Sequence, residues 1–121
     1  MKFSKSKAFK SGWDGLDFWA YSSKDDFANT SATYFETTKA HGKIKTTVSD
    51  RIYYVIEGQG VFEIDGSQEK VGPTDVIIVP KNTEYDYWAT DGTTLKLFMV
   101  HVPAFDPAGE VLLDKTKRQD L

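Results

Sequence analysis

Residues 51–66 (RIYYVIEGQGVFEIDG) and residues 71–88 (VGPTDVIIVPKNTEYDYW) decide the fold of this chain. Each stretch holds two short runs of β-branched and aromatic residues separated by turn-forming residues, which is the pattern of a β-hairpin. Asp65-Gly66 is typical of a two-residue hairpin turn in which both residues take positive φ angles. Pro80 follows an apolar run and is expected to end that strand, because it has no N–H to donate.

The same pattern continues on both sides of these hairpins. No segment keeps a helical apolar period over three turns, whereas short runs rich in Val, Ile, Tyr, Phe and Thr recur between turn formers. Many short strands at regular spacing are typical of a sandwich or barrel, so we predict an all-β fold. The predicted strands are Thr33–Thr37, Lys43–Thr47, Ile52–Ile56, Gly60–Ile64, Val76–Val79, Tyr85–Thr90 and Thr94–His101.

Length and composition exclude several classes of protein. A chain of 121 residues with 40% hydrophobic residues is expected to form one domain with one core. The net charge of −3 provides no basic surface for nucleic acid, and the absence of cysteine excludes disulfides and thiolate chemistry. No apolar run approaches the roughly 20 residues that cross a bilayer, and no secretory leader is visible. We therefore expect a cytoplasmic protein that contacts neither nucleic acid nor membrane.

Two groups of residues resemble the signature motifs of the cupin family, small β-barrels that usually hold a metal. Tyr54-Val55-Ile56-Glu57-Gly58 is similar to the end of the first motif. Gly72, Asp75 and Pro80 match the second motif, with Asn82 in place of a glycine. The resemblance implies a double-stranded β-helix, or jelly-roll barrel, like that of cupin-type sugar epimerases.

The resemblance also implies a division of the chain and an assembly. We expect a single cupin domain over residues 1–121, with an N-terminal strand and covering segment at about 1–30, the barrel at about 31–107 and a C-terminal tail at about 108–121. Trp13, Phe18 and Trp19 are expected to cover the barrel or to form a dimer contact. Both faces of the strand at residues 51–56 are apolar, so both are expected to be covered. The habit of the family implies a homodimer.

The positions that hold the metal in this family carry other residues here. Lys45 and Thr47 stand where the first motif has two histidines, Arg51 stands at its glutamate, and Tyr85 stands at the histidine of the second motif. Each positive charge about 4 Å from a cation costs about 4 kcal/mol at an effective dielectric constant near 20. The resemblance therefore implies a barrel whose usual metal ligands are replaced, and we predict no metal site.

The same cations attract an anion, and Arg51 can offer a carboxylate or phosphate two parallel hydrogen bonds. Tyrosines nearby add hydroxyls and flat apolar faces of the kind that bind a sugar or a small aromatic acid. We therefore predict that the barrel binds a small anionic or sugar-like molecule without any cofactor. The predicted ligand-binding residues are Arg51, Tyr53, Tyr85, Lys45, Thr47, Tyr87 and His101.

Each of these assignments has a structural alternative. Lys45 points to solvent if the register of its strand slips by one residue. Tyr85 and Tyr87 can simply pack in the core or at its rim, and His101 can be a hydrogen-bonded histidine of the barrel wall. An inward arginine is usually paired, so Arg51 can instead form a structural ion pair. Its possible partners are Asp50, Glu36 and Asp86.

Three other functions remain open from the sequence. The first is a metal-independent sugar isomerase or epimerase, with His101 and Tyr85 as the candidate catalytic base and acid. The second is a metal-dependent enzyme with a relocated ligand set, built from His41, His101 and a carboxylate, although His41 is expected to be exposed in a loop. The third is a barrel filled by its own side chains, whose role is protein association.

Overall fold

The computed structural model describes residues 1–113, which form two antiparallel β-sheets. The described part also contains two short 3₁₀ helices, η1 (Lys5–Lys7) and η2 (Pro107–Gly109). One sheet consists of β1 (Phe9–Trp13), β2 (Leu16–Ala20), β3 (Ser31–Thr37), β5 (Asp50–Glu57), β8 (Val76–Val79) and β10 (Leu95–Val102). The other consists of β4 (Ile44–Thr46), β6 (Gly60–Ile64), β7 (Ser67–Val71), β9 (Glu84–Ala89) and β11 (Glu110–Leu112).

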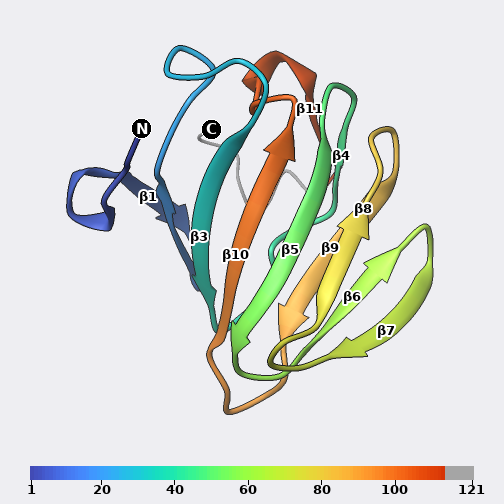
Figure 1. The fold of residues 1–121 in the computed structure, drawn as a ribbon. Coiled ribbons are helices and arrows are strands. Elements are labelled where there is room, and N and C mark those ends of the chain that lie inside the picture. The colour runs from blue at the N-terminus through green and yellow to red at the C-terminus, as the bar shows by residue number, and fades with distance from the viewer. Residues whose placement is uncertain (114–121) are drawn as a thin grey trace.

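The two sheets face each other and enclose the core, as in a jelly-roll barrel (Figure 1). The strand order is β1-β2-β3-β10-β5-β8 in the larger sheet and β11-β4-β9-β6-β7 in the smaller one. The predicted all-β jelly-roll fold is therefore confirmed. No helix within residues 1–113 has the length and apolar character needed to cross a bilayer.

All seven predicted strands are present, with ends that differ by two residues at most. The two predicted hairpins are wrong, because β5 and β6 lie in different sheets, as do β8 and β9. Sequence patterns predicted one N-terminal strand where β1 and β2 form a hairpin, and they missed β7 and β11. Four of the five residues of β7 are exposed, so this edge strand has no alternating pattern to recognise. The three-residue β11 pairs with β4, so strand pairing continues beyond residue 107, where we expected the barrel to end.

Alternation along the strands decides which side chains enter the barrel. In β10, Leu95, Leu97, Met99 and His101 are buried, as expected for one inward row, and Lys96 lies on the wetter outer face. The apolar part of the core is formed at the end of the barrel where β10 begins. Its buried side chains include Phe35, Val55, Phe62, Leu95 and Leu97.

The register of three neighbouring strands places polar residues together at the other end. His101 of β10 lies directly opposite Ser31 of β3 on one side and Arg51 of β5 on the other. Because residues opposite one another point to the same face of a sheet, all three enter the barrel, and all three are buried. This row of polar residues is the base of the candidate site.

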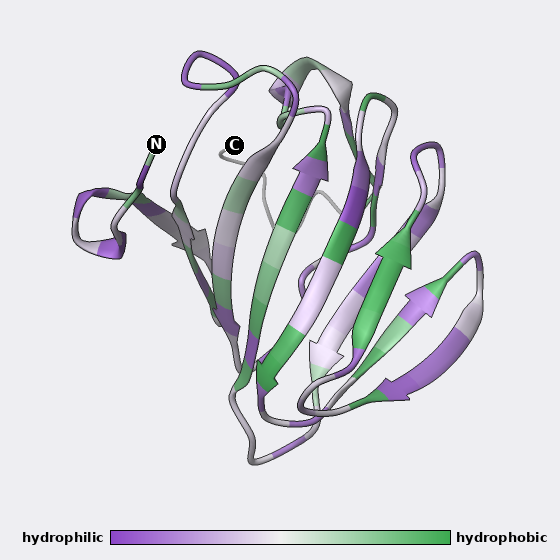
Figure 2. Ribbon diagram, viewed as in Figure 1, coloured by the Kyte–Doolittle hydropathy of each residue, from purple (hydrophilic) through white to green (hydrophobic). Residues whose placement is uncertain are grey.

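The outer face of the larger sheet is unusually apolar. Ile52 and Tyr54 of β5 and Val76 and Ile78 of the edge strand β8 are exposed, with Ile78 at 61% of its maximum. Figure 2 shows hydrophobic colouring along β8, and on β5 hydrophobic stretches on either side of a paler middle. The expectation that both faces of β5 are covered is therefore wrong for the single chain, because only the inner face is.

Candidate ligand-binding site

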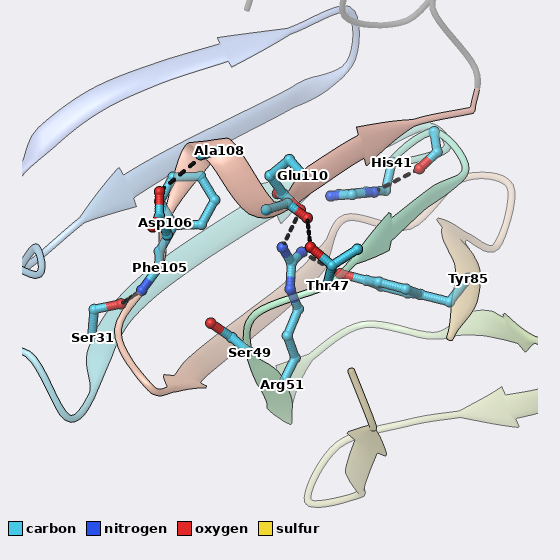
Figure 3. A network of polar contacts seen from close by, with 12 residues as sticks. Ser31, His41, Thr47, Ser49, Arg51, Tyr85, Phe105, Asp106, Ala108 and Glu110 are labelled. Atoms are coloured by element: carbon cyan, nitrogen blue, oxygen red, sulfur yellow. Dashed lines mark hydrogen bonds and ion pairs between the residues drawn. The ribbon is translucent and has the colours of Figure 1, made fainter. Parts of the chain in front are cut away.

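Arg51 lies inside the barrel and anchors the polar cluster. Its side chain is 2% exposed because it occupies an inward position of β5, between the outward residues Asp50 and Ile52. Nη1 donates a hydrogen bond to the Tyr85 hydroxyl at 2.5 Å, and Nη2 forms an ion pair with Oε2 of Glu110 at 2.7 Å (Figure 3). The predicted inward direction and the possibility of an ion pair are both confirmed. The partner is Glu110, however, and none of the acidic residues considered from the sequence.

Tyr53, Tyr85 and Tyr87 are completely buried inside the barrel. The hydroxyls of Tyr53 and Tyr85 are 2.7 Å apart, so a line of hydrogen bonds runs from Arg51 through Tyr85 to Tyr53. Burial raises the pKa of both Tyr53 and Tyr85, although the Arg51 charge opposes this shift. Both phenols therefore keep their protons at neutral pH and are available to donate or accept hydrogen bonds.

His101 is buried beside Arg51 and is 3% exposed. Neither of its ring nitrogens has a hydrogen-bond partner within the described residues, and its ring packs against Phe105 at 5.1 Å. Burial and the neighbouring Arg51 charge lower the pKa of His101 to about 2. His101 is thus a neutral imidazole and a weak base, and the alternative of a hydrogen-bonded wall histidine does not hold.

His41 is the functional candidate that sequence analysis misplaced. It is 1% exposed and stacks on Tyr87 with ring centres 4.6 Å apart, so the expected exposed position is wrong. The reason is that residues 40–42 pair with β9: the His41 N–H donates to the Tyr87 carbonyl at 2.7 Å. Nδ1 lies 2.8 Å from the Gly42 carbonyl, so Nδ1 carries a proton and donates to that oxygen.

Two predicted ligand contacts are wrong. In β4, Ile44 and Thr46 are buried and Lys45 between them faces outward, so the register is shifted by one residue from the predicted one. Thr47 is exposed, and its hydroxyl donates to the Gly109 carbonyl at 3.1 Å. Because β4 has only three residues, its sequence offers too little alternation to fix the register. Lys45 therefore adds no positive charge to the interior.

Glu110 comes from the part of the chain predicted to be a tail. It is carried by the segment 103–112, which leaves β10, passes through η2 and ends in β11 beside β4. Its side chain is 14% exposed, against 2% for Arg51, so the carboxylate lies on the solvent side of the guanidinium. No local pattern in the sequence reveals this contact, because the two residues are far apart in the chain.

The donor groups at this end do not fit a divalent metal. No three His, Cys, Asp or Glu side chains come together as a metal site within residues 1–113. The fixed positive charge of Arg51 opposes a cation at this end of the barrel. A guanidinium, phenols, imidazoles and a carboxylate instead suit hydroxyl groups and anions.

The inward side chains at this end are closely covered, since Arg51, Tyr85 and His101 are each 3% exposed or less. A hollow of about 300 Å³ lies elsewhere, near the start of β10, and its lining includes Trp13, Leu16 and Thr94. A molecule that enters beside Arg51 therefore has to displace part of the protein. The segment 103–112 is the natural candidate, since it carries the outermost residue of the cluster.

Comparison with known proteins identifies the type of domain. A family model described as the AraC-like ligand-binding domain matches residues 51–114, more than half of the chain. No curated protein has a detectably similar sequence.

Solved structures share the fold at low sequence identity. Pac13 of Streptomyces, described as a nucleoside dehydratase, is 24% identical with a TM-score of 0.83, covering 94% of this chain and 91% of that one. KdgF of Halomonas sp. is 16% identical with a TM-score of 0.73 (89% and 97% covered). The polyketide cyclase RemF of Streptomyces resistomycificus is 17% identical with a TM-score of 0.74 (93% and 84% covered). These are cupin-fold proteins, so the predicted cupin resemblance is confirmed.

Proposed function

Because the chain belongs to the family of AraC-like ligand-binding domains, we propose that it binds a small anionic or sugar-like molecule at the Arg51 end of the barrel. The observation that carries this proposal is a set of buried polar atoms with spare hydrogen-bonding capacity. Nε of Arg51 and both ring nitrogens of His101 have no hydrogen-bond partner within the described residues.

Such atoms are costly inside a protein. A buried donor or acceptor without a partner costs about 1–3 kcal/mol, and native structures contain few of them. A barrel whose interior served only to support protein association would be filled with apolar side chains at no such cost. A hydroxyl-rich or anionic ligand would supply the missing partners, and the rings of Tyr53 and Tyr85 would pack against its apolar face.

The neighbouring structures suggest which molecule to test first. Pac13 is described as a nucleoside dehydratase and has been solved with uridine. A nucleoside combines a hydroxyl-rich sugar with a flat base, which matches the chemistry of the cluster around Arg51 and the tyrosines. Uridine and uridine monophosphate therefore form an informative pair of probes, since they differ only in an anionic group.

Calorimetric titration and thermal shift with these two probes, and with a panel of sugar acids and sugar phosphates, test the proposal. We expect one class of probe to raise the melting temperature of the wild type. The Tyr85→Phe variant should lose most of the shift, because its hydroxyl joins Arg51 to Tyr53. Tyr54→Phe is the matched control, since Tyr54 lies on the outer face and is 42% exposed. The absence of binding across the whole panel would refute the proposal.

A second candidate function is metal-independent acid–base catalysis on the bound sugar, as in an isomerase or epimerase. The favouring observation is His41, whose ring is oriented by the Nδ1 hydrogen bond to the Gly42 carbonyl and stacks beside Tyr87 and, at 5.9 Å, Tyr85. His101, the base expected from the sequence, is a poorer candidate because of its lowered pKa of about 2. In this function His41 takes a proton from a carbon next to a carbonyl, and a tyrosine hydroxyl protonates the carbonyl oxygen.

Exchange of substrate carbon-bound hydrogen in D₂O, followed by NMR, separates catalysis from binding. His41→Gln should abolish the exchange and His101→Gln should leave most of it. Binding of a probe without hydrogen exchange would contradict the catalytic function and support binding alone.

We also propose that the chain forms a homodimer through the outer face of the larger sheet. The exposed apolar residues Ile52, Tyr54, Val76 and Ile78 lie on β5 and on the edge strand β8. A second copy of the chain would cover this face and the unpaired backbone of β8 together. Light scattering of the purified chain tests this, with a mass of twice 13.6 kDa as the expected result.

A further inference from the structure

We infer that Glu110 is an internal competitor for an anion site at Arg51: a carboxylate or phosphate group of a ligand displaces Glu110 and lifts the segment 103–112 that carries it. The inference rests on the proposed function only in that both use the same end of the barrel. The inference goes further than the proposed function by assigning a role to one part of the ligand: its anionic group opens the site.

The order of the two charges from outside to inside is the first support. Glu110 is 14% exposed and Arg51 is 2% exposed, with 2.7 Å between Oε2 and Nη2 (Figure 3). A molecule approaching from solvent therefore meets the carboxylate before the guanidinium. The Arg51 charge becomes available to a ligand only when Glu110 leaves.

The second support is that Glu110 uses only part of the arginine. The Nε–H and one Nη2–H lie along the same edge of the planar guanidinium, where an anion can accept both hydrogen bonds in parallel. Glu110 pairs with Nη2, while Nε has no partner within the described residues. A ligand anion that is free to choose its position can engage both groups, so it can bind more strongly than the tethered carboxylate. His101 lies next to Arg51 and offers a further buried donor or acceptor.

The third support is that residues 107–112 are attached at one edge only. The start of the segment is held more firmly, by the Ala104 N–H on the Ala28 carbonyl at 3.1 Å and the Phe105 N–H on Oγ of Ser31 at 2.9 Å, so it serves as the hinge. β11 has three residues and pairs on one side only, with β4. Its end is held by the Thr47 N–H on the Gly109 carbonyl at 2.9 Å and by the Leu113 N–H on the Lys43 carbonyl at 3.0 Å. Opening residues 107–112 breaks these edge hydrogen bonds and detaches β11 from the smaller sheet, while the other four strands of that sheet stay paired, as in local unfolding.

The direct test is anion rescue. Glu110→Ala leaves the buried Arg51 charge without its partner, so its melting temperature should fall. Formate or phosphate should then raise the melting temperature of this variant by about 4 °C or more, beyond the effect of sodium chloride at equal ionic strength, and that of the wild type by less than half as much. Rescue by formate alone indicates a carboxylate ligand, and rescue by phosphate alone indicates a phosphate ligand.

Two controls are available within the chain. Glu57→Ala removes an exposed ion pair with Lys96 at 3.0 Å and should show no rescue. The double variant Arg51→Met/Glu110→Ala should also show none, because it lacks the receiving charge. Equal anion effects on the Glu110→Ala variant, these controls and the wild type would overturn the inference.

A second measurement needs neither a ligand nor a destabilised variant. Lys45 and Val111 lie opposite each other on the outer side of the β4–β11 pair, and the chain has no cysteine, so Lys45→Cys/Val111→Cys can form one disulfide that locks the segment. Phenylglyoxal should modify Arg51, read by peptide mass spectrometry, at least about tenfold more slowly in the oxidised protein than in the reduced protein or the wild type. Equal rates would show that the segment does not control access. If the lock and the rescue succeed while no probe of the whole panel binds the wild type, the inference stands and the proposed function falls.

Discussion

The two ends of the barrel interior are built from the same strands but are stabilised in different ways. At the end where β10 begins, Val55, Leu95 and Leu97 are fully buried and need only close packing. At the other end, Arg51 and His101 are also buried, but each needs charge balance or hydrogen bonds that packing cannot supply. The backbone hydrogen bonds between strands are of the same kind at both ends. The two ends differ only in whether the inward side chains are apolar or polar.

The polar end is close to neutral in spite of its charged residues. The Arg51 charge is balanced by Glu110, the raised pKa values keep Tyr53 and Tyr85 protonated, and His101 stays unprotonated. Such an arrangement is rarely the cheapest way to fill a barrel, since well-packed apolar residues are often as stable as a buried ion pair. The two ends therefore differ in what stabilises them: close packing at the apolar end, and charge pairing with hydrogen bonds at the polar end.

The largest expected effect is at the apolar end. Leu97→Ala should lower the free energy of unfolding by about 2–5 kcal/mol, because it removes a fully buried side chain and leaves a cavity. Urea denaturation at neutral pH measures this change. Val100→Ala, on the outer face of the same strand, should cost less than half as much. Equal losses would mean that the inner face of β10 is not the main source of stability.

A smaller loss is expected from one oxygen atom at the polar end. Tyr85→Phe leaves Nη1 of Arg51 and the Tyr53 hydroxyl without their shared partner, so the free energy of unfolding should fall by about 1–3 kcal/mol. Tyr54→Phe, on the exposed face, should change it by less than about 0.5 kcal/mol. A neutral Tyr85→Phe variant would contradict the view that hydrogen bonds hold this end together.

The pH dependence of stability separates the two ends further. In the unfolded chain His101 takes up a proton near pH 6.5, whereas in the folded protein its pKa is about 2. Between these values the unfolded state binds more protons, so the contribution of His101 to stability is complete above pH 6.5 and falls by about 1.4 kcal/mol for each pH unit below it.

His101→Phe should remove this part of the slope, while Leu97→Ala should lower stability equally at pH 7 and pH 5. The groups that face His101 are Arg51 from β5, Ser31 from β3 and the ring of Phe105, and of these only Arg51 carries a charge. Denaturation curves of the three proteins at several pH values make the comparison. Parallel slopes for wild type and His101→Phe would rule out a buried neutral histidine.

Sequence analysis predicted the parts of this molecule in which local patterns are repeated. Turn residues bounded the strands, and Asp65-Gly66 forms a hairpin turn between β6 and β7. The inward position of Arg51 came from its place in the first cupin motif, because residues 51–56 are apolar on both faces. The positive φ angles of Asp65, Gly66 and Asn82 are those expected at their turns. These features depend on neighbours in the chain, so a single sequence contains them.

The remaining parts of the site depend on contacts between distant residues. Glu110 reaches Arg51 from a three-residue strand, and His41 is buried only because its backbone pairs with β9. The predicted inward positions of Lys45 and Thr47 failed because β4 is too short for its alternation to fix a register. The inward position of Arg51 was thus predictable from the sequence, whereas the contacts of Glu110 and His41 that complete the cluster were not.

The smallest effect on the stability of a single chain, and the one that tests the outer face, is expected from Ile78→Lys. Ile78 is 61% exposed on the edge strand β8, so the substitution should change the free energy of unfolding of the monomer by less than about 0.5 kcal/mol. If a second copy covers this face, two lysines would meet near the twofold axis, and light scattering should show a monomer. Gln68→Lys adds the same charge on the exposed edge strand β7 and should leave the dimer intact. Dissociation by both variants would point to net charge as the cause, and dissociation by neither would remove the outer face of β8 from the interface.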